Sequence, residues 1–191
     1  MLKRFITAMV AFGVVLFTIG VNAADGSKRV KITTNLGVIE IELAPTEAPA
    51  SVENFLNYAK AGFYDGTIFH RVIEGFMVQG GGFDPGLKKK DTKEPIQNEA
   101  DNGLQNVVGA LAMARTNDPH SATAQFFINT ADNHSLNHTD KSPRGWGYAV
   151  FGKVTSGLDV VRQIEGSTTG QSNGMGDVPI EDVVIQKVEV E

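Results

Sequence analysis

Several short stretches of the sequence contain residue types at spacings that enzymes use for catalysis or ligand binding. The segment GQSNG at residues 170–174 fits the G-x-S-x-G turn that exposes a nucleophilic serine in one class of hydrolases. That turn follows a strand, precedes a helix and depends on a histidine later in the chain. The segment lies instead in a polar stretch, residues 166–177, and all four histidines precede it. A serine hydrolase is therefore a distant alternative.

The histidines and glycines also form patterns that resemble ligand sites. His134 and His138 are four residues apart, as in zinc-binding helices, but the residues between them lack the glutamate of a zinc protease. Asn133, Asn137 and Thr139 favour a loop at this point. The run at residues 81–88 does not end in Gly-Lys-Ser/Thr, so it is not a phosphate-binding loop. The absence of cysteine excludes thiol chemistry and disulfides. We expect neither a metal nor another cofactor.

The stretch FHRVIEGFMVQGGGFDPG, residues 69–86, places an arginine inside an apolar run. Its alternation predicts two strands joined at Gly75, with Phe69, Arg71 and Ile73 on one face of the first strand. Two interpretations are open on these residues alone. Either Arg71 is a surface residue near an ordinary core, or it is a charge placed beside an apolar site.

Short strands and two helices must position these residues. Residues 30–43 predict a hairpin, because Ile39, Ile41 and Leu43 alternate with glutamates. The other predicted strands are residues 67–73, 76–80, 107–114, 125–130, 148–155 and 182–190. Eight short strands can close into a barrel that side chains fill. The predicted fold is therefore mainly β, a closed eight-stranded antiparallel barrel capped by two α-helices.

The two predicted helices are amphipathic. Residues 51–62 place apolar residues at helical spacing, with Ser51 as the N-cap and Gly62 as the stop. The second helix begins at Leu158. The long connections at residues 81–106, 116–124, 131–145 and 167–179 are polar, and loops of this length usually shape a site. The sequence shows no internal repeat, so residues 24–191 form one domain.

Residues 1–23 have the pattern of a cleavable export signal. Lys3 and Arg4 form a basic start, an apolar run of about 16 residues follows, and Ala23 ends a small-residue exit. A retained membrane anchor is the alternative, but a helix that crosses a bilayer needs ~20 apolar residues. Cleavage would remove two basic residues and no acidic one, and the net charge would change from −5 to −7.

An acidic exported domain excludes nucleic-acid binding, which requires a clustered basic surface. The lysines at residues 88–90 form one basic cluster, which we interpret as a solvated loop. We expect a monomer in the periplasm, with secretion as the second choice, and no stable membrane association after signal cleavage.

The chain resembles the cyclophilin-type peptidyl-prolyl cis-trans isomerases. The resemblance is carried by FHRVIEGFMVQGG at residues 69–81, LAMAR at 111–115, AQFFIN at 124–129 and YAVFGKV at 148–154. It is nearest to bacterial members, through PHSATAQFFIN at residues 119–129, and it extends over residues 30–190. The barrel fold of that family agrees with the strand count above, and the resemblance implies an enzyme without a cofactor.

The resemblance also implies roles for individual residues. Arg71 occupies the position of the catalytic arginine, and Phe76 and Gln79 occupy the positions of its catalytic neighbours. The implied substrate-binding residues are Met77, Ala114, Arg115, Gln125, Phe127, Leu136 and Tyr148.

Three positions depart from the family pattern. Ser135 replaces an aromatic residue that is often tryptophan, Tyr148 replaces a histidine of many eukaryotic members, and Arg115 replaces their asparagine. These changes leave the arginine and the proline pocket intact but alter the outer contacts. The missing aromatic residue predicts weak binding of cyclosporin, the family's inhibitor.

The implied reaction is rotation about X-Pro peptide bonds in exported proteins, which assists their folding. A guanidinium donor that binds the nitrogen of the twisted bond better than that of the planar bond lowers the barrier. The implied partners are proline-containing, unfolded or partly folded polypeptides. The alternative is a chaperone module that binds proline peptides in the same groove without catalysis, and an isomerase assay separates the two.

Overall fold

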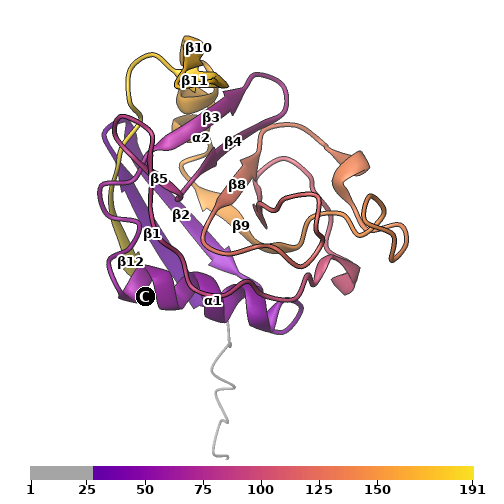
Figure 1. The fold of residues 1–191 in the computed structure, drawn as a ribbon. Coiled ribbons are helices and arrows are strands. Elements are labelled where there is room, and N and C mark those ends of the chain that lie inside the picture. The colour runs from indigo at the N-terminus through magenta and orange to yellow at the C-terminus, as the bar shows by residue number, and fades with distance from the viewer. Residues whose placement is uncertain (1–27) are drawn as a thin grey trace, which may run out of the picture.

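The computed structural model describes residues 28–191, and the predicted signal at residues 1–23 lies outside this range. An antiparallel sheet of eight strands has the order β12-β1-β2-β9-β7-β8-β4-β3 (Figure 1). Its strands are β1 (Lys28–Thr34), β2 (Gly37–Leu43), β3 (Phe69–Ile73), β4 (Met77–Gly80), β7 (Ala110–Met113), β8 (Phe126–Asn129), β9 (Val150–Ser156) and β12 (Ile185–Val190). The eight strands predicted from the sequence are these eight.

The sheet curls through 242° and stays open, so the prediction of a closed barrel is wrong. The edge strands β3 and β12 are connected near a single bridge between Ile68 and Val184. The Phe69 N–H donates to Val183 O beside it. Beyond this point β3 continues along β4 and β12 continues along β1, so no ladder forms between the two edges.

The free edge of β3 is covered by a hairpin that the sequence analysis took for a loop. Strands β10 (Thr169–Ser172) and β11 (Met175–Pro179) form this hairpin, and β11 packs along β3. Asn173 and Gly174 have positive φ angles at its turn, as a tight Asn-Gly hairpin turn requires. A covered edge is protected from pairing with other chains. A second short hairpin consists of β5 (Phe83–Asp84) and β6 (Lys88–Lys89).

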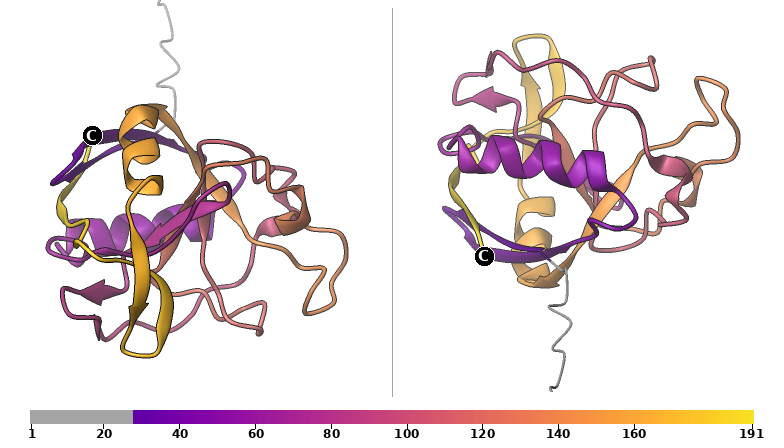
Figure 2. Two further views of the ribbon diagram at one scale, coloured as in Figure 1. Left: turned by 90° about the horizontal axis from the view of Figure 1, so that it is seen from above. Right: turned by 90° about the horizontal axis from the view of Figure 1, so that it is seen from below.

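The two helices lie at opposite ends of the curled sheet (Figure 2). Helix α1 (Pro49–Lys60) has Ala48 as its N-cap, three residues before the predicted one. Ser51 is therefore inside the helix, and the prediction that it is the N-cap is wrong. The Glu99 carboxylate, 48 residues along the chain from Ser51, accepts hydrogen bonds from the Ser51 N–H and hydroxyl. Helix α2 (Leu158–Glu165) agrees with its prediction.

The strands pack different side chains on their two faces. Phe126 and Ile128 of β8 belong to the main core inside the curl, whereas Phe127 belongs to a smaller cluster on the outer face. Strand β4 divides in the same way, with Val78 inside and Met77 outside. The two short 3-10 helices, η1 (Ala100–Asn102) and η2 (His134–Leu136), lie in the long loops.

Strand β3 departs from simple alternation. Phe69 pairs with Gly80 and Arg71 pairs with Gln79, so His70 is an extra residue on this strand. Such a β-bulge shifts the following side chains to the opposite face. Phe69 consequently lies in the main core, whereas Ile73 packs against the outer cluster. The prediction that Phe69 shares a face with Arg71 and Ile73 is wrong because of this bulge.

Candidate active site

A pocket of about 100 Å³ lies on the outer face of the sheet. Strands β3 and β4 and the turn between them line part of it, and β8, η2, the residues that follow β7 and the segment before β9 line the rest. Nine of the ten residues that the sequence analysis named line this pocket: Arg71, Phe76, Met77, Gln79, Ala114, Arg115, Phe127, Leu136 and Tyr148. The tenth, Gln125, contacts one of them.

The pocket has an apolar base. Met77 and Phe127 are 2% and 4% exposed and belong to the outer cluster. The Phe127 ring meets the Tyr148 ring edge to face, with ring centroids 5.7 Å apart. Phe76, Ala114 and Leu136 are partly buried around them, as Tyr148 is. An apolar concave surface with a few polar groups at its edge is the usual form of a ligand site.

Arg71 supplies the positive charge at this edge. Arg71 is exposed, whereas its chain neighbours His70 and Val72 are buried. The Arg71 Nε lies 3.7 Å from Asp177 Oδ2, an acidic residue of β11, and about half of each side chain is exposed. Asp177 was missed by the sequence analysis, because the contact depends on a hairpin packing against a strand more than 100 residues earlier in the chain.

Gln79 and Gln125 form a polar pair beside Arg71. The Gln79 Nε2 donates to Gln125 Oε1 at 3.0 Å. Gly82 lies against the Gln125 side chain so closely that a Cβ at residue 82 would overlap it. The glycine therefore permits the approach that fixes Gln125, and Gln125 in turn orients the Gln79 amide.

Arg115 lines the pocket but directs its donors elsewhere. Its Nε donates to Gly147 O at 2.8 Å, and its terminal nitrogens donate to Thr116 O and Pro143 O. The guanidinium carbon lies 4.5 Å from the centre of the Tyr148 ring. Arg115 thus connects residues 143–148 to the end of β7 and holds Tyr148 at the pocket wall.

His70, next to Arg71, is a buried titratable residue that the sequence analysis did not assign to the site. It is 4% exposed and packs against the Phe83 ring. Its Nδ1 has no hydrogen-bond partner among residues 28–191. Burial lowers the pKa of His70 to about 4, and the positive charge of Arg71 acts in the same direction. His70 is therefore neutral at pH 7.

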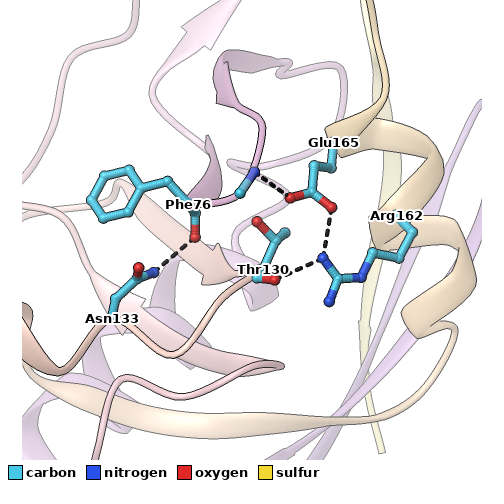
Figure 3. A network of polar contacts seen from close by, with 6 residues as sticks. Phe76, Thr130, Asn133, Arg162 and Glu165 are labelled. Carbon is cyan, nitrogen blue, oxygen red and sulfur yellow. Dashed lines mark hydrogen bonds and ion pairs between the residues drawn. The ribbon is translucent and has the colours of Figure 1, made fainter.

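A polar network supports the pocket from behind (Figure 3). Asn133 Nδ2 donates to Phe76 O at 2.8 Å, and the Thr130 N–H donates to the same carbonyl. The Gly75 N–H donates to Glu165 Oε1 on α2 at 2.8 Å. Sequence patterns give no signal for these contacts, because each partner is distant along the chain from the turn that it holds.

Buried asparagines complete this support. Asn129 Nδ2 donates to Asn106 Oδ1, and Asn129 Oδ1 accepts from Asn133. Asn106 also donates to the carbonyls of Leu136 and Tyr148, two residues of the pocket wall. The asparagine-rich loops were expected to shape a site, but the individual residues were not identified from the sequence.

The histidine pair that the sequence analysis considered for metal binding does not form a metal-ligand cluster. Across residues 28–191 no group of three or more potential metal-ligating side chains occurs. His138 Nδ1 instead contacts Trp146 O at 3.0 Å.

Within residues 28–191, no helix has the length and apolar character needed to cross a bilayer.

Residues 29–190 match the family model for cyclophilin type peptidyl-prolyl cis-trans isomerase/CLD. The chain is 62% identical to peptidyl-prolyl cis-trans isomerase cyp18 of Streptomyces antibioticus over 161 residues, which cover 84% of this chain and 97% of that protein. It is 60% identical to peptidyl-prolyl cis-trans isomerase B of Escherichia coli K12 over 157 residues, which cover 82% of this chain and 96% of that protein.

A comparison with solved structures also finds a member of this family. A crystal structure of a cyclophilin type peptidyl-prolyl cis-trans isomerase from Cryptosporidium parvum, in the presence of the dipeptide Ala-Pro, aligns with a TM-score of 0.73. The alignment covers 85% of this chain and 98% of that one, with 28% sequence identity.

Proposed function

The chain belongs to the cyclophilin-type peptidyl-prolyl cis-trans isomerase family, and on this premise we propose that the pocket beside Arg71 is its catalytic site. The protein is an isomerase that accelerates rotation about X-Pro peptide bonds. The observation that supports this site is the convergence of a half-exposed guanidinium with an apolar pocket of suitable size for a proline ring.

The reaction requires no bond breaking and no proton transfer. Resonance holds the peptide bond planar with a barrier of ~18–20 kcal/mol, and an X-Pro bond rotates unaided in tens to hundreds of seconds. As the bond twists, the nitrogen becomes pyramidal and its lone pair localises. The twisted form therefore contains a hydrogen-bond acceptor that the planar forms lack.

Arg71 acts on that acceptor in our proposal. A guanidinium stays protonated at every relevant pH and offers several donors in a rigid arrangement. The contact of Asp177 with Nε leaves the two terminal nitrogens available for the substrate. A donor that binds the twisted nitrogen more strongly than the planar one lowers the barrier without a cofactor.

The apolar residues hold the proline ring. Phe76, Met77, Phe127 and Leu136 line the pocket and would exclude water from the ring. Exclusion of water strengthens the effect of the Arg71 charge at short range. Gln79, oriented by Gln125, hydrogen-bonds the substrate backbone so that only one side of the peptide rotates.

We assign the remaining pocket residues to substrate contact at the rim. Ala114 is small and partly buried, so it leaves room for the residue before proline. Tyr148 contacts the ring from the side of Phe127. Backbone carbonyls occupy the guanidinium donors of Arg115. Arg115 therefore contacts the substrate with the aliphatic part of its side chain and also acts indirectly by holding Tyr148.

The required energies are modest. Each ~1.36 kcal/mol of preferential stabilisation of the transition state is a factor of ten in rate. An acceleration of about 10⁵-fold then needs about 7 kcal/mol from all contacts together. Charged hydrogen bonds in a partly dry site can supply this sum.

The test of this assignment is a prolyl isomerase assay on Arg71→Ala beside the unmodified protein. We expect the variant to keep its fold, measured by circular dichroism, and to lose most of its activity. An isomerase whose activity is unchanged by this substitution has its catalytic donor elsewhere.

We further propose that the protein is exported and acts as a monomer on proline-containing, unfolded or partly folded polypeptides in the periplasm. The support is the pattern of residues 1–23. The mass of the protein from a periplasmic fraction tests this: cleavage after Ala23 leaves a chain that begins at Ala24. Recovery of the full-length chain from the cytoplasm would contradict it.

A further inference from the structure

We propose that Glu165 of α2 is a positioning residue of the isomerase, which fixes the β3–β4 turn and with it the pocket side of Phe76. The inference rests on the proposed function of the pocket. Glu165 does not line the pocket and has no role in the reaction chemistry above. It acts through the backbone of the hairpin that carries Arg71, Met77 and Gln79.

Glu165 occupies a position that is unfavourable for a carboxylate. It is the last residue of α2, where the partial negative charge of a helix terminus disfavours an acidic side chain. The residue is also 8% exposed, and burial of a charge costs free energy unless several partners compensate it. An acidic residue here must therefore form specific contacts, which the structure provides.

The contacts of Glu165 connect α2 to two segments of the site (Figure 3). Its Oε1 accepts the Gly75 N–H at 2.8 Å, and its Oε2 accepts from Arg162 Nη1 at 2.7 Å. The same Arg162 nitrogen donates to Thr130 O at 2.7 Å. Burial alone would raise the pKa of Glu165, but the hydrogen bonds from Arg162 and the Gly75 N–H contribute to a pKa below the usual value. The group is thus an anion at pH 7.

These contacts close a ring around the turn. The N–H of Thr130 donates to Phe76 O at 3.0 Å, so Glu165, Arg162 and Thr130 hold two of the three turn residues, Gly75 and Phe76. Gly75 has φ +70° and is the residue at which the chain reverses. In Figure 3 the Phe76 ring points away from Glu165, as expected if the network holds the backbone while the ring remains free for substrate.

The variants Glu165→Ala and Glu165→Gln test the proposal. Glutamine retains an oxygen that can accept the Gly75 N–H, whereas alanine retains none. We expect kcat/KM to fall about tenfold in Glu165→Ala, as for loss of a hydrogen bond to a charged group, and to stay within about threefold of the unmodified enzyme in Glu165→Gln. The ¹⁵N–¹H resonance of Gly75 should move upfield in Glu165→Ala and less in Glu165→Gln.

A matched control separates positioning from stability. Val30→Ala removes part of a buried side chain of β1, and Val30 does not line the pocket. All variants are assayed at a temperature where circular dichroism shows them folded. The proposal requires that Val30→Ala keep kcat/KM although its melting temperature falls. Loss of the same activity in Val30→Ala, or full activity in Glu165→Ala, would overturn the proposal.

An Arg71→Ala arm distinguishes failure of this inference from failure of the proposed site. If Arg71→Ala is inactive and Glu165→Ala is fully active, the site stands and the positioning role is wrong. If Arg71→Ala is fully active, the site assignment itself fails, and the positioning role with it.

Discussion

The two faces of the curled sheet are packed to different degrees. The inner face packs against the helices in one large cluster, which includes Phe126 and Phe151 of the sheet and Phe55 of α1. The outer face has a smaller cluster around Met77 and Phe127, and several of its members are only partly buried. Because side chains alternate along each strand, the same strands build both clusters.

This difference shows how the fold provides a site. The outer cluster lacks the covering helix of the inner core and leaves a pocket of about 100 Å³. A proline ring can supply the missing apolar contacts. In our proposal the inner cluster stabilises the fold and the outer cluster binds substrate, so substitutions on the two faces should have different consequences.

The largest effect on stability is expected at the inner face. Phe126→Ala removes a fully buried ring and should lower the free energy of unfolding by about 3 to 5 kcal/mol. Urea denaturation measures this change. The fraction that remains folded should keep its kcat, and a large loss of kcat in the folded protein would break the distinction between the two faces.

The pH dependence of stability tests whether His70, the bulge residue of β3, is buried in its neutral form. Its folded pKa of about 4 lies below the unfolded value, so the native state binds fewer protons. The contribution of neutral His70 to the free energy of unfolding is complete above about pH 6.5 and is lost as the pH falls toward 4. The total change is about 3 kcal/mol. The difference between the denaturation midpoints of the unmodified protein and His70→Gln should be constant above about pH 6.5 and should shift against the unmodified protein as the pH falls toward 4. Parallel curves for the two proteins would contradict the assignment.

At the outer face we expect a smaller loss of stability and a larger loss of binding. Phe127→Ala opens a space that joins the existing pocket, so solvent can enter it, and the cost should be about 3 kcal/mol, at the low end for such truncations. KM for a proline tetrapeptide should rise about tenfold, since a proline ring loses its main apolar contact. An unfolding free energy reduced as much as in Phe126→Ala, with unchanged KM, would place Phe127 in the structural core.

The smallest effect is expected at the rim. Asp177 and Arg71 are half exposed and 3.7 Å apart, and such pairs contribute roughly 0.2–1 kcal/mol. Asp177→Asn should therefore change kcat by less than about fivefold. The difference from the unmodified enzyme should shrink as salt rises, because exposed charges are screened. A difference that is independent of salt would indicate a role other than charge.

The sequence was sufficient for the eight strands of the large sheet, for the presence of the two α-helices and for nine of the ten named pocket residues, but not for the hairpins β5–β6 and β10–β11. Alternation along β4 and β8 separates Met77 and Phe127 from Val78 and Phe126, and the resemblance to a known family predicted that Met77 and Phe127 bind substrate. These features are local, so a single stretch of residues contains the information.

Features that depend on distant contacts were not predicted. The bulge at His70, which places Arg71 on the outer face, follows from pairing between β3 and β4. The carboxylate that accepts the first-turn N–H groups of α1 is that of Glu99, and the carboxylate behind Phe76 is that of Glu165, 90 residues from Gly75 in the chain. Closure of the sheet was expected from the strand count, but the count does not determine whether the two edge strands meet.

The central claim is that Arg71 stabilises the twisted peptide bond more than it stabilises either planar form. NMR exchange spectroscopy on an Ala-Pro peptide measures both the dissociation constant and the rate of interconversion on the enzyme. For Arg71→Ala the account predicts a dissociation constant within about threefold of the unmodified value and an interconversion rate at least about 100-fold lower. A rate that is preserved while binding is lost would show that Arg71 only holds the substrate, and the account would be wrong.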